Sequence, residues 1–185
     1  MFGNVPLSTD FTDTETKPNS TRSEVYNFVK SELDAVIPLL SEKKDATTYG
    51  RINKWAALAI RMQLFLNAEV YSGTAQWAAA KADADAIINS GLYSLEAVYS
   101  DNFKEQNEGS SENIFVVPYD EVFAGGFNWV AMTLHYASQN TFNLTFQPWN
   151  GYATVEEFYN SYVDPSTNPG PQGDVIKGQG AATGT

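Results

Sequence analysis

The fold of this chain is decided by residues 49–73, YGRINKWAALAIRMQLFLNAEVYSG. This stretch predicts a helix that begins near Asn53 and stops at Gly73, with apolar residues on two opposite faces. A helix that is apolar on opposite sides must pack between neighbours, so we expect this one at the centre of a helical region. One face carries Trp55, Leu58, Ala59, Met62, Phe65 and Leu66, and the other carries Ala57, Ile60, Leu64, Ala68 and Tyr71.

A first helix is predicted on the N-terminal side of this stretch. Thr21 and Glu24 have the spacing of a capping box, in which the hydroxyl and the carboxylate each accept a backbone N–H. Lys43 and Lys44 follow the helix, where we expect them to face its negative end. The apolar residues recur at three- and four-residue steps and form one stripe of Val25, Phe28, Val29, Leu33, Val36, Ile37 and Leu40.

A third helix is predicted at residues 75–90, capped by Thr74 and closed by Gly91 in the left-handed conformation. The tight turn at residues 72–74 makes it the second arm of an antiparallel hairpin, and its many alanines allow close backbone approach. We assign Trp77 to the core, as we do Trp55 on the preceding helix. The inner stripe consists of Trp77, Ala80, Ala84, Ile87 and Ile88.

The pattern is less regular after Gly91. Tyr93, Leu95 and Tyr99 predict a short packed segment, and residues 101–105 predict one helical turn. Residues 113–119, NIFVVPY, have the β-branched and aromatic composition of a strand, which Pro118 ends or places at an edge.

The C-terminal part begins with a second capping box, formed by Thr154 and Glu157, which predicts a short helix with Phe158 and Tyr162 facing inward. Residues 164–185 are rich in glycine, proline and small polar residues, so we expect a flexible loop or tail. We therefore divide the chain into an extended lead-in at 1–20, a helical hairpin region at 21–105, a loop-rich ligand-binding region at 106–163 and the tail at 164–185.

Composition excludes several classes of protein. The net charge is −11 and the pI about 4.4, which disfavours binding to nucleic acid or to anionic lipid. The absence of cysteine removes disulfides, thiolate metal sites and thiol nucleophiles, and we predict no metal and no cofactor. No apolar run approaches the ~20 residues of a membrane-spanning helix. Met1 leads directly into a polar stretch, so we find no signal peptide.

Aromatic residues make up 14% of the chain, and many lie beyond residue 113 among glycines, asparagines and prolines. Rigid rings on loops, next to amide side chains, can hold the apolar faces and hydroxyl groups of sugars. The same rings could instead fill the core between loops and helices. The candidate ligand-binding residues lie in the loops at 125–129 and 147–152, and they are Trp129, Asn128, Trp149, Asn150 and Tyr152.

The order of several motifs resembles the SusD/RagB family. The likeness is carried by FGNVPLSTD at residues 2–10, by the stretch at 49–73, and by the helix from Trp77 with its IINSGLYSL ending at residues 87–95. It continues in YSDNF at 99–103, SENIF at 111–115, GYAT at 151–154 and EFY at 157–159. No single motif is decisive, but together they cover roughly residues 2–162.

The resemblance implies a mainly α fold of tetratricopeptide-like helical hairpins, with long aromatic-rich loops and a few short strands. It also implies a cell-surface protein that binds oligosaccharide or polysaccharide and delivers it to a SusC-like TonB-dependent transporter of the outer membrane. The attachment would be an N-terminal lipid that this chain does not carry. Family members are longer, and here Asp164 leads into PSTN in place of an Asp-x-Arg motif, so we expect an internal fragment.

Two other classes of function stay open. The first is a helical-repeat module that binds proteins and no sugar. The second is a remnant of a glycoside hydrolase, which would need two carboxylates facing one cleft. Glu156 and Glu157 are adjacent and point apart on a helix, and Asp83 and Asp85 diverge on a face that we expect to be solvated. His135, the single histidine, has no evident catalytic partner. We therefore predict no enzyme activity.

Overall fold

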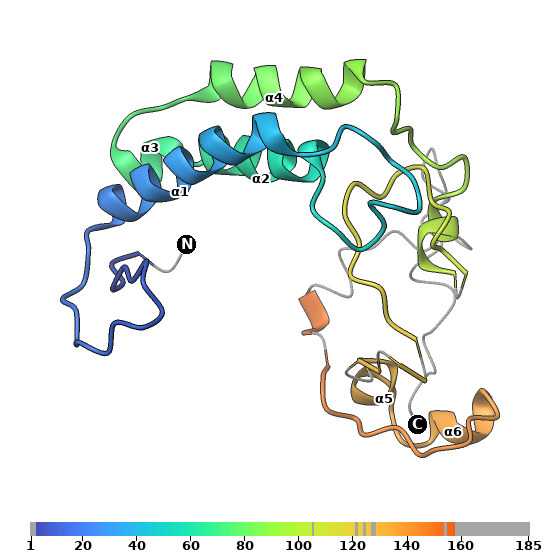
Figure 1. The fold of residues 1–185 in the computed structure, drawn as a ribbon. Coiled ribbons are helices and arrows are strands. Elements are labelled where there is room, and N and C mark those ends of the chain that lie inside the picture. Colours follow the sequence, from blue (N-terminus) through green and yellow to red (C-terminus); the bar gives the residue numbers. More distant parts are fainter. Residues whose placement is uncertain are drawn as a thin grey trace. The chain divides into compact units, whose positions relative to one another are not determined.

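The computed structural model describes residues 3–104, 106–120, 122–123, 125–126, 129–153 and 155–157 (Figure 1). The chain divides into two compact units, Met1–Pro118 and Tyr119–Thr185. The predicted helical fold is confirmed, and the residues described form no strand. The predicted helix with Phe158 and Tyr162, and the tail at 164–185, lie outside the described residues.

The first helix, α1 (Arg22–Val36), begins with the predicted capping box. The Thr21 hydroxyl accepts a hydrogen bond from the Glu24 N–H at 3.2 Å, and the Glu24 carboxylate accepts one from the Thr21 N–H at 2.7 Å. Pro38 lies in the short 3-10 helix η1 (Ile37–Leu39) that continues from α1. The predicted stripe is only partly right, because Tyr26, which lies outside it, is 1% exposed and therefore one of the most buried side chains.

The lead-in before α1 is a loop closed on itself. The Ser20 N–H donates to the Val5 carbonyl at 2.9 Å, and the Asn4 side chain accepts from the Arg22 N–H at 2.9 Å. The Arg22 guanidinium in turn donates to the Val70 carbonyl. These bonds fasten residues 4–20 to the beginning of α1.

The central helix is α2 (Lys54–Leu66), followed by the short helix α3 (Ala68–Ser72). Asn53 caps α2 by accepting from the Ala56 N–H, and Gly73 ends α3 with φ +80°. As predicted, α2 packs against neighbours on two sides, with α1 and η1 on one and α4 (Trp77–Asn89) on the other. Ile60 and Leu66 are nevertheless exposed. Many of the buried residues form two clusters, one of Ile37, Trp55, Ala57, Leu58 and Ile87 and the other of Tyr26, Leu64 and Ala68.

Helix α4 runs antiparallel to α2 as predicted (Figure 1), and Gly91 follows it with φ +67°. Three expectations about this helix were wrong, besides that for Ile88, which was assigned to the inner stripe but is 70% exposed. It begins at Trp77 with Gln76 in place of Thr74 as the cap residue, and no side-chain hydrogen bond caps it. Trp77 is 60% exposed and is no core residue, since it lies on the first turn.

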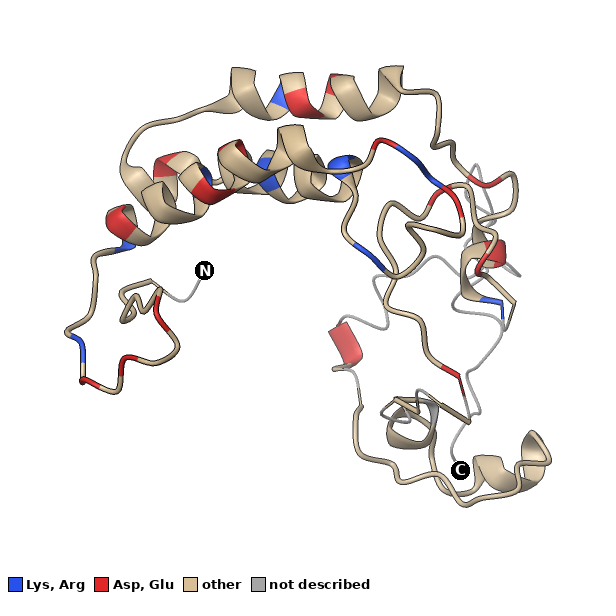
Figure 2. Cartoon of the chain, viewed as in Figure 1, with Lys and Arg blue, Asp and Glu red and all other residues tan. Residues whose placement is uncertain are grey.

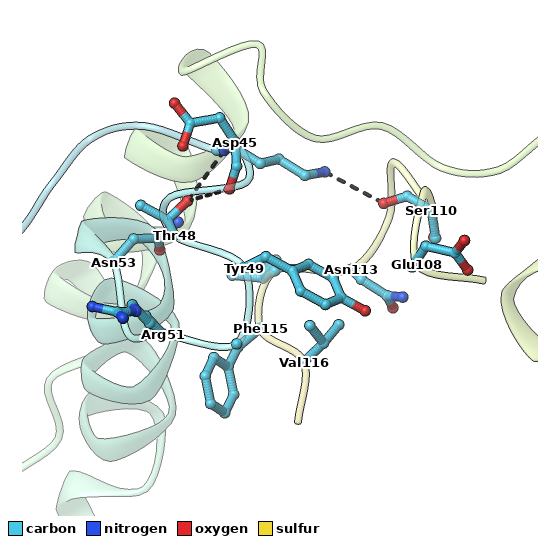
Figure 3. Close-up of a pocket in the computed structure, with 13 residues that line it drawn as sticks. Asp45, Thr48, Tyr49, Arg51, Asn53, Glu108, Ser110, Asn113, Phe115 and Val116 are labelled. Carbon is cyan, nitrogen blue, oxygen red and sulfur yellow. Dashed lines mark hydrogen bonds between the residues drawn. The ribbon is translucent and has the colours of Figure 1, made fainter. Parts of the chain in front are cut away.

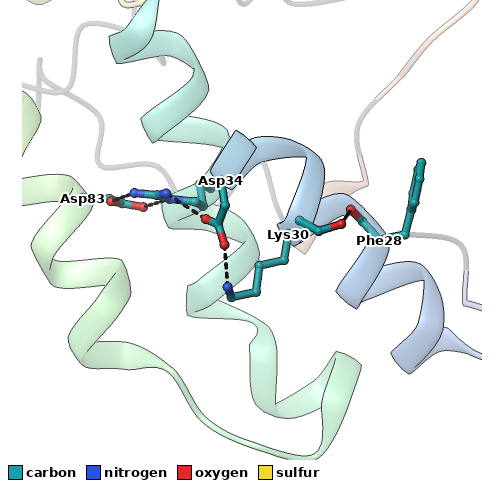
Figure 4. Close-up of polar contacts among 6 residues, drawn as sticks. Phe28, Lys30, Asp34 and Asp83 are labelled. Carbon is teal, nitrogen blue, oxygen red and sulfur yellow. Dashed lines mark hydrogen bonds and ion pairs between the residues drawn. The ribbon is translucent and has the colours of Figure 1, made fainter. Parts of the chain in front are cut away.

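The third wrong expectation concerns Asp83, which is buried on the face of α4 toward α2. The Arg61 guanidinium donates to both of its carboxylate oxygens, at 2.9 and 2.7 Å, and to Asp34 at 2.9 Å (Figure 4). Lys30 completes the network with a 2.6 Å bond to Asp34. A buried carboxylate is stable only when it is paired and hydrogen-bonded, and Arg61 meets that condition by linking α1, α2 and α4.

Lys44 connects the loop before α2 to the loops that follow α4. Its ammonium group donates to the carbonyls of Leu92, Ser110 and Ser111 and lies 4.3 Å from the centre of the Tyr93 ring. Burial lowers the pKa of Lys44, while nearby Glu96 acts in the opposite direction. The expectation that Lys44 faces the end of α1 was therefore wrong, since distant carbonyls compete for it.

The residues after Gly91 follow the sequence pattern in part. The predicted helical turn is present as the 3-10 helix η2 (Tyr99–Phe103). Tyr93 is half-buried, but Leu95 and Tyr99 are exposed, so the predicted packed segment is wrong at those two positions. Residues 113–119 form no strand, because nothing in the described chain pairs with them as a neighbouring strand.

None of the helices in the described ranges is long and apolar enough to cross a membrane.

Candidate functional site

The predicted binding residues that the structure describes all lie in the second unit, Tyr119–Thr185. This unit contains two short helices, α5 (Trp129–Thr133) and α6 (Ser138–Thr141). Trp129 is the first residue of α5, so its expected position on a loop was wrong. Trp149, Asn150 and Tyr152 belong to a loop, as predicted, and Asn128 lies outside the described residues.

This loop is held by four main-chain hydrogen bonds, three to α5 and one to the residue that follows it. The Trp149 N–H donates to the Ala131 carbonyl at 2.6 Å, and the N–H groups of Gly151 and Tyr152 both donate to the Met132 carbonyl. The Asn150 N–H donates to the Leu134 carbonyl just beyond the helix. The last carbonyls of a helix have no partner within it, so the loop satisfies groups that α5 leaves open.

Two residues make this close approach possible. Asn150 has φ +50°, a left-handed conformation that asparagine adopts more readily than most residues. Gly151 lies directly against Met132, and a Cβ atom at this position would overlap the Met132 sulfur. The local sequence Trp–Asn–Gly–Tyr therefore sets the path of the loop as well as its side chains.

The rings at this site are solvent-accessible. Trp129 and Tyr152 stack with 5.8 Å between ring centres and 23° between ring planes. Trp129 is 60% exposed, Tyr152 is 52% exposed and Trp149 is 56% exposed. The α5 contacts thus bring the four predicted residues together around a pair of stacked rings, and we call Trp129, Trp149 and Tyr152 the ring cluster.

The surroundings of the ring cluster carry no formal charge in the sequence. From Val122 to Val155 there is no aspartate, glutamate, lysine or arginine, although the chain as a whole has a net charge of −11 (Figure 2). His135 is exposed, its Nδ1 atom accepts from the Ala137 N–H at 3.1 Å, and its ring packs on Tyr136. A surface of rings, amides and backbone groups without charge suits a neutral ligand that has both apolar faces and hydroxyl groups.

Sequence reasoning missed the residues that position the ring cluster. Ala131 is fully buried beneath it and, with Met132, supplies the carbonyls that hold the loop. The only sequence signal was the Asn150–Gly151 pair, which is typical of a tight turn but does not name the partner.

Acidic residues do not gather into a metal site in the described ranges, where no group of three or more histidine or carboxylate side chains could hold an ion. Glu156 and Glu157 are both exposed. Thr154, the predicted partner of Glu157 in a capping box, lies outside the described residues.

Comparison with known proteins points in one direction. No family model matches the chain. The chain is similar to SusD over part of its length. It is 29% identical over 119 residues to the starch-binding protein SusD of Bacteroides thetaiotaomicron, a match that covers 63% of this chain and 21% of that protein. The chain thus spans about a fifth of the length of the curated relative that it matches.

Proposed function

We propose that this chain binds a neutral glycan at the ring cluster and performs no covalent chemistry on it. The observation that carries the proposal is the stacked, exposed pair of Trp129 and Tyr152, fastened by main-chain bonds beside the exposed Trp149. The similarity to a starch-binding protein supports the same class of ligand.

The physical basis is the match between rings and sugars. A sugar presents apolar C–H faces, which lose contact with water when they lie on an aromatic ring. Tryptophan and tyrosine have only two side-chain torsions, so holding them in place costs little entropy. Asn150 and, by sequence, Asn128 would supply amide groups for the hydroxyls. Because no charge lies between Val122 and Val155, the site gives no reason to prefer an acidic or basic sugar.

The wider role that we propose follows what the resemblance to the SusD/RagB family implies. The chain would belong to a protein of the cell surface, attached to the outer membrane by an N-terminal lipid and delivering oligosaccharide to a SusC-like TonB-dependent transporter. In that setting the α2–α4 hairpin would be one of several tetratricopeptide-like hairpins that form the scaffold.

The test is isothermal titration of the chain with maltoheptaose and with a panel of other neutral oligosaccharides. We expect binding to at least one of them, and we expect Trp129→Ala and Trp149→Ala each to weaken it by about tenfold, the equivalent of 1.4 kcal/mol. Chromatography of the same mixtures should show the oligosaccharide at its original length.

Trp77→Ala is the matched control. Trp77 is as exposed as Trp129, at 60%, but lies on α4 in the other unit. It should leave the affinity unchanged, and the helical circular dichroism of all three variants should persist. Equal losses in all three variants, or no binding to any sugar by the unaltered chain, would count against the proposal.

A second candidate function is a helical module that binds proteins. It is favoured by the exposed apolar side chains of the helical unit, which include Ile60, Leu66, Trp77 and Ile88. The coding sequence upstream separates the two candidates. A signal peptide with a lipidated cysteine favours the glycan-binding role at the surface, whereas a cytoplasmic start followed by further helical hairpins favours the scaffold.

A further inference from the structure

The first unit contains a cleft that the ring cluster does not explain. It lies between the loop at residues 44–53 and the loop at residues 108–116 and encloses about 60 Å³ (Figure 3). A wider hollow of about 430 Å³ adjoins it along Lys44, Tyr49, Glu108 and Ser110. The enclosed part has room for a few water molecules or a small group such as a hydroxymethyl, and the hollow has room for more.

The walls of the cleft are held by hydrogen bonds among its own residues. Lys44 donates to the Ser111 carbonyl at 3.0 Å and thereby ties one loop to the other. Thr48 donates to the Lys43 carbonyl, and the Asn53 side chain donates to the same carbonyl at 3.1 Å. Gly50 lies against Pro118, where an added Cβ would be 3.1 Å from the proline ring. The two loops are therefore fixed before any ligand arrives.

A second set of residues lines the cleft without taking part in this framework. The Glu108 carboxylate and the Arg51 guanidinium are exposed, and the Asn113 amide is half-buried. Within the part of the chain that the structure describes, none of these three side-chain groups makes a hydrogen bond or an ion pair. The Tyr49 ring, 44% exposed, lies beside Asn113 and Val116 at the centre of the cleft (Figure 3).

The charges of the cleft cancel. Lys44 and Arg51 contribute two positive charges, and Asp45 and Glu108 contribute two negative ones, so the sum is zero in a chain whose net charge is −11. A charged ligand would gain little from such a balance. A polyhydroxylated neutral ligand can donate to the Glu108 carboxylate and accept from the Asn113 amide, with an apolar face on the Tyr49 ring.

We propose that this cleft is a second sugar contact, which takes one residue of a neutral oligosaccharide with its ring against Tyr49 and its hydroxyl groups on Glu108 and Asn113. The ligand class rests on the proposed function, but the residues are separate from the ring cluster and belong to the other unit. The chain would thus hold sugar at two places.

The experiment is a ¹H–¹⁵N correlation spectrum of the full chain titrated with maltotriose. We expect saturable shifts at the Gly50 and Asn113 amides, and a separate set of shifts at the indole N–H signals of Trp129 and Trp149. Tyr49→Ala and Glu108→Gln should each weaken the first set by about fivefold or more and leave the second set in place. Trp129→Ala should do the reverse.

The control is Tyr99→Ala, an exposed tyrosine of the same unit that does not line the cleft. Because Glu108 is an exposed loop residue, Glu108→Gln keeps the test valid even if Tyr49→Ala disturbs the fold. Shifts confined to the indole signals would overturn the second contact and leave the ring cluster standing. Shifts at Gly50 with inorganic phosphate, but not with maltotriose, would also overturn it, because the cleft would then select anions.

Discussion

Replacement of Asp83 by alanine should destabilise the helical unit strongly. The side chain of Asp83 is 7% exposed and accepts two hydrogen bonds from Arg61, whose own side chain is 20% exposed. Removing one partner of a fully buried ion pair costs about 3–5 kcal/mol, since the other charge is left unpaired. Here Arg61 keeps Asp34 at 2.9 Å and some contact with water, so we expect a loss of about 2–3 kcal/mol.

The assay is urea denaturation followed by far-ultraviolet circular dichroism, with Asp85→Ala as the matched control. Asp85 lies on the same helix and pairs with Lys81, but both side chains are largely exposed. Such a surface pair contributes about 0.5 kcal/mol or less. Equal effects of the two substitutions would refute the reasoning. A double variant, Arg61→Met with Asp83→Leu, should recover most of the loss, because it leaves no charge unpaired.

Two further predictions concern the same unit. A hydrogen bond from Lys30 holds the pKa of Asp34 below its ordinary value against partial burial, and Arg61 adds to the effect. The stability that this carboxylate contributes is complete above the unfolded-state pKa and is lost as the pH falls below about 4. Asp34→Asn should therefore make the free energy of unfolding depend less steeply on pH in the acid range. Gly73→Ala should lower the free energy of unfolding by about 1 kcal/mol, because the backbone φ of Gly73 is +80°, although an added Cβ would meet no other atom. Gly109→Ala, at a position without a positive φ, should leave the free energy of unfolding almost unchanged in the same denaturation experiments.

The features that could be predicted from the sequence are those that depend on neighbours within one or two turns. The capping box of Thr21 and Glu24, the end of α3 at Gly73 and the left-handed Gly91 are all set by local backbone geometry. The apolar period of residues 53–73 also predicted correctly that α2 packs on two sides.

The errors arose where the partner is distant in the chain. Asp83 was assigned to solvent because its partner, Arg61, is 22 residues away, and Lys44 was assigned to a helix end because its carbonyl partners are 48 to 67 residues away. Trp77 fits the inner stripe by period, yet it is 60% exposed on the first turn of α4. Periodicity predicts which residues share a face, but it does not predict how far the neighbouring helix extends.

In the candidate site, too, the residue types could be predicted from the sequence, whereas the contacts between distant residues could not. The sequence identified Trp129, Trp149, Asn150 and Tyr152 by residue type and by their glycine-rich setting. It could not predict that Tyr152 stacks on Trp129, since that contact depends on the bonds from the loop to the Ala131 and Met132 carbonyls. The binding role of these residues, like that of Asn128, stays a prediction until it is measured.

The backbone anchoring of the loop at 149–152 also bears on how such a surface could evolve. Amide and carbonyl groups hold it in place, and every amino acid except proline offers the same donor. Trp149 can therefore be replaced by phenylalanine or tyrosine without removing any of the four main-chain hydrogen bonds. Substitutions at position 149 would therefore change the exposed side chain and keep the path of the loop, whereas a side chain at Gly151 would require Met132 to move.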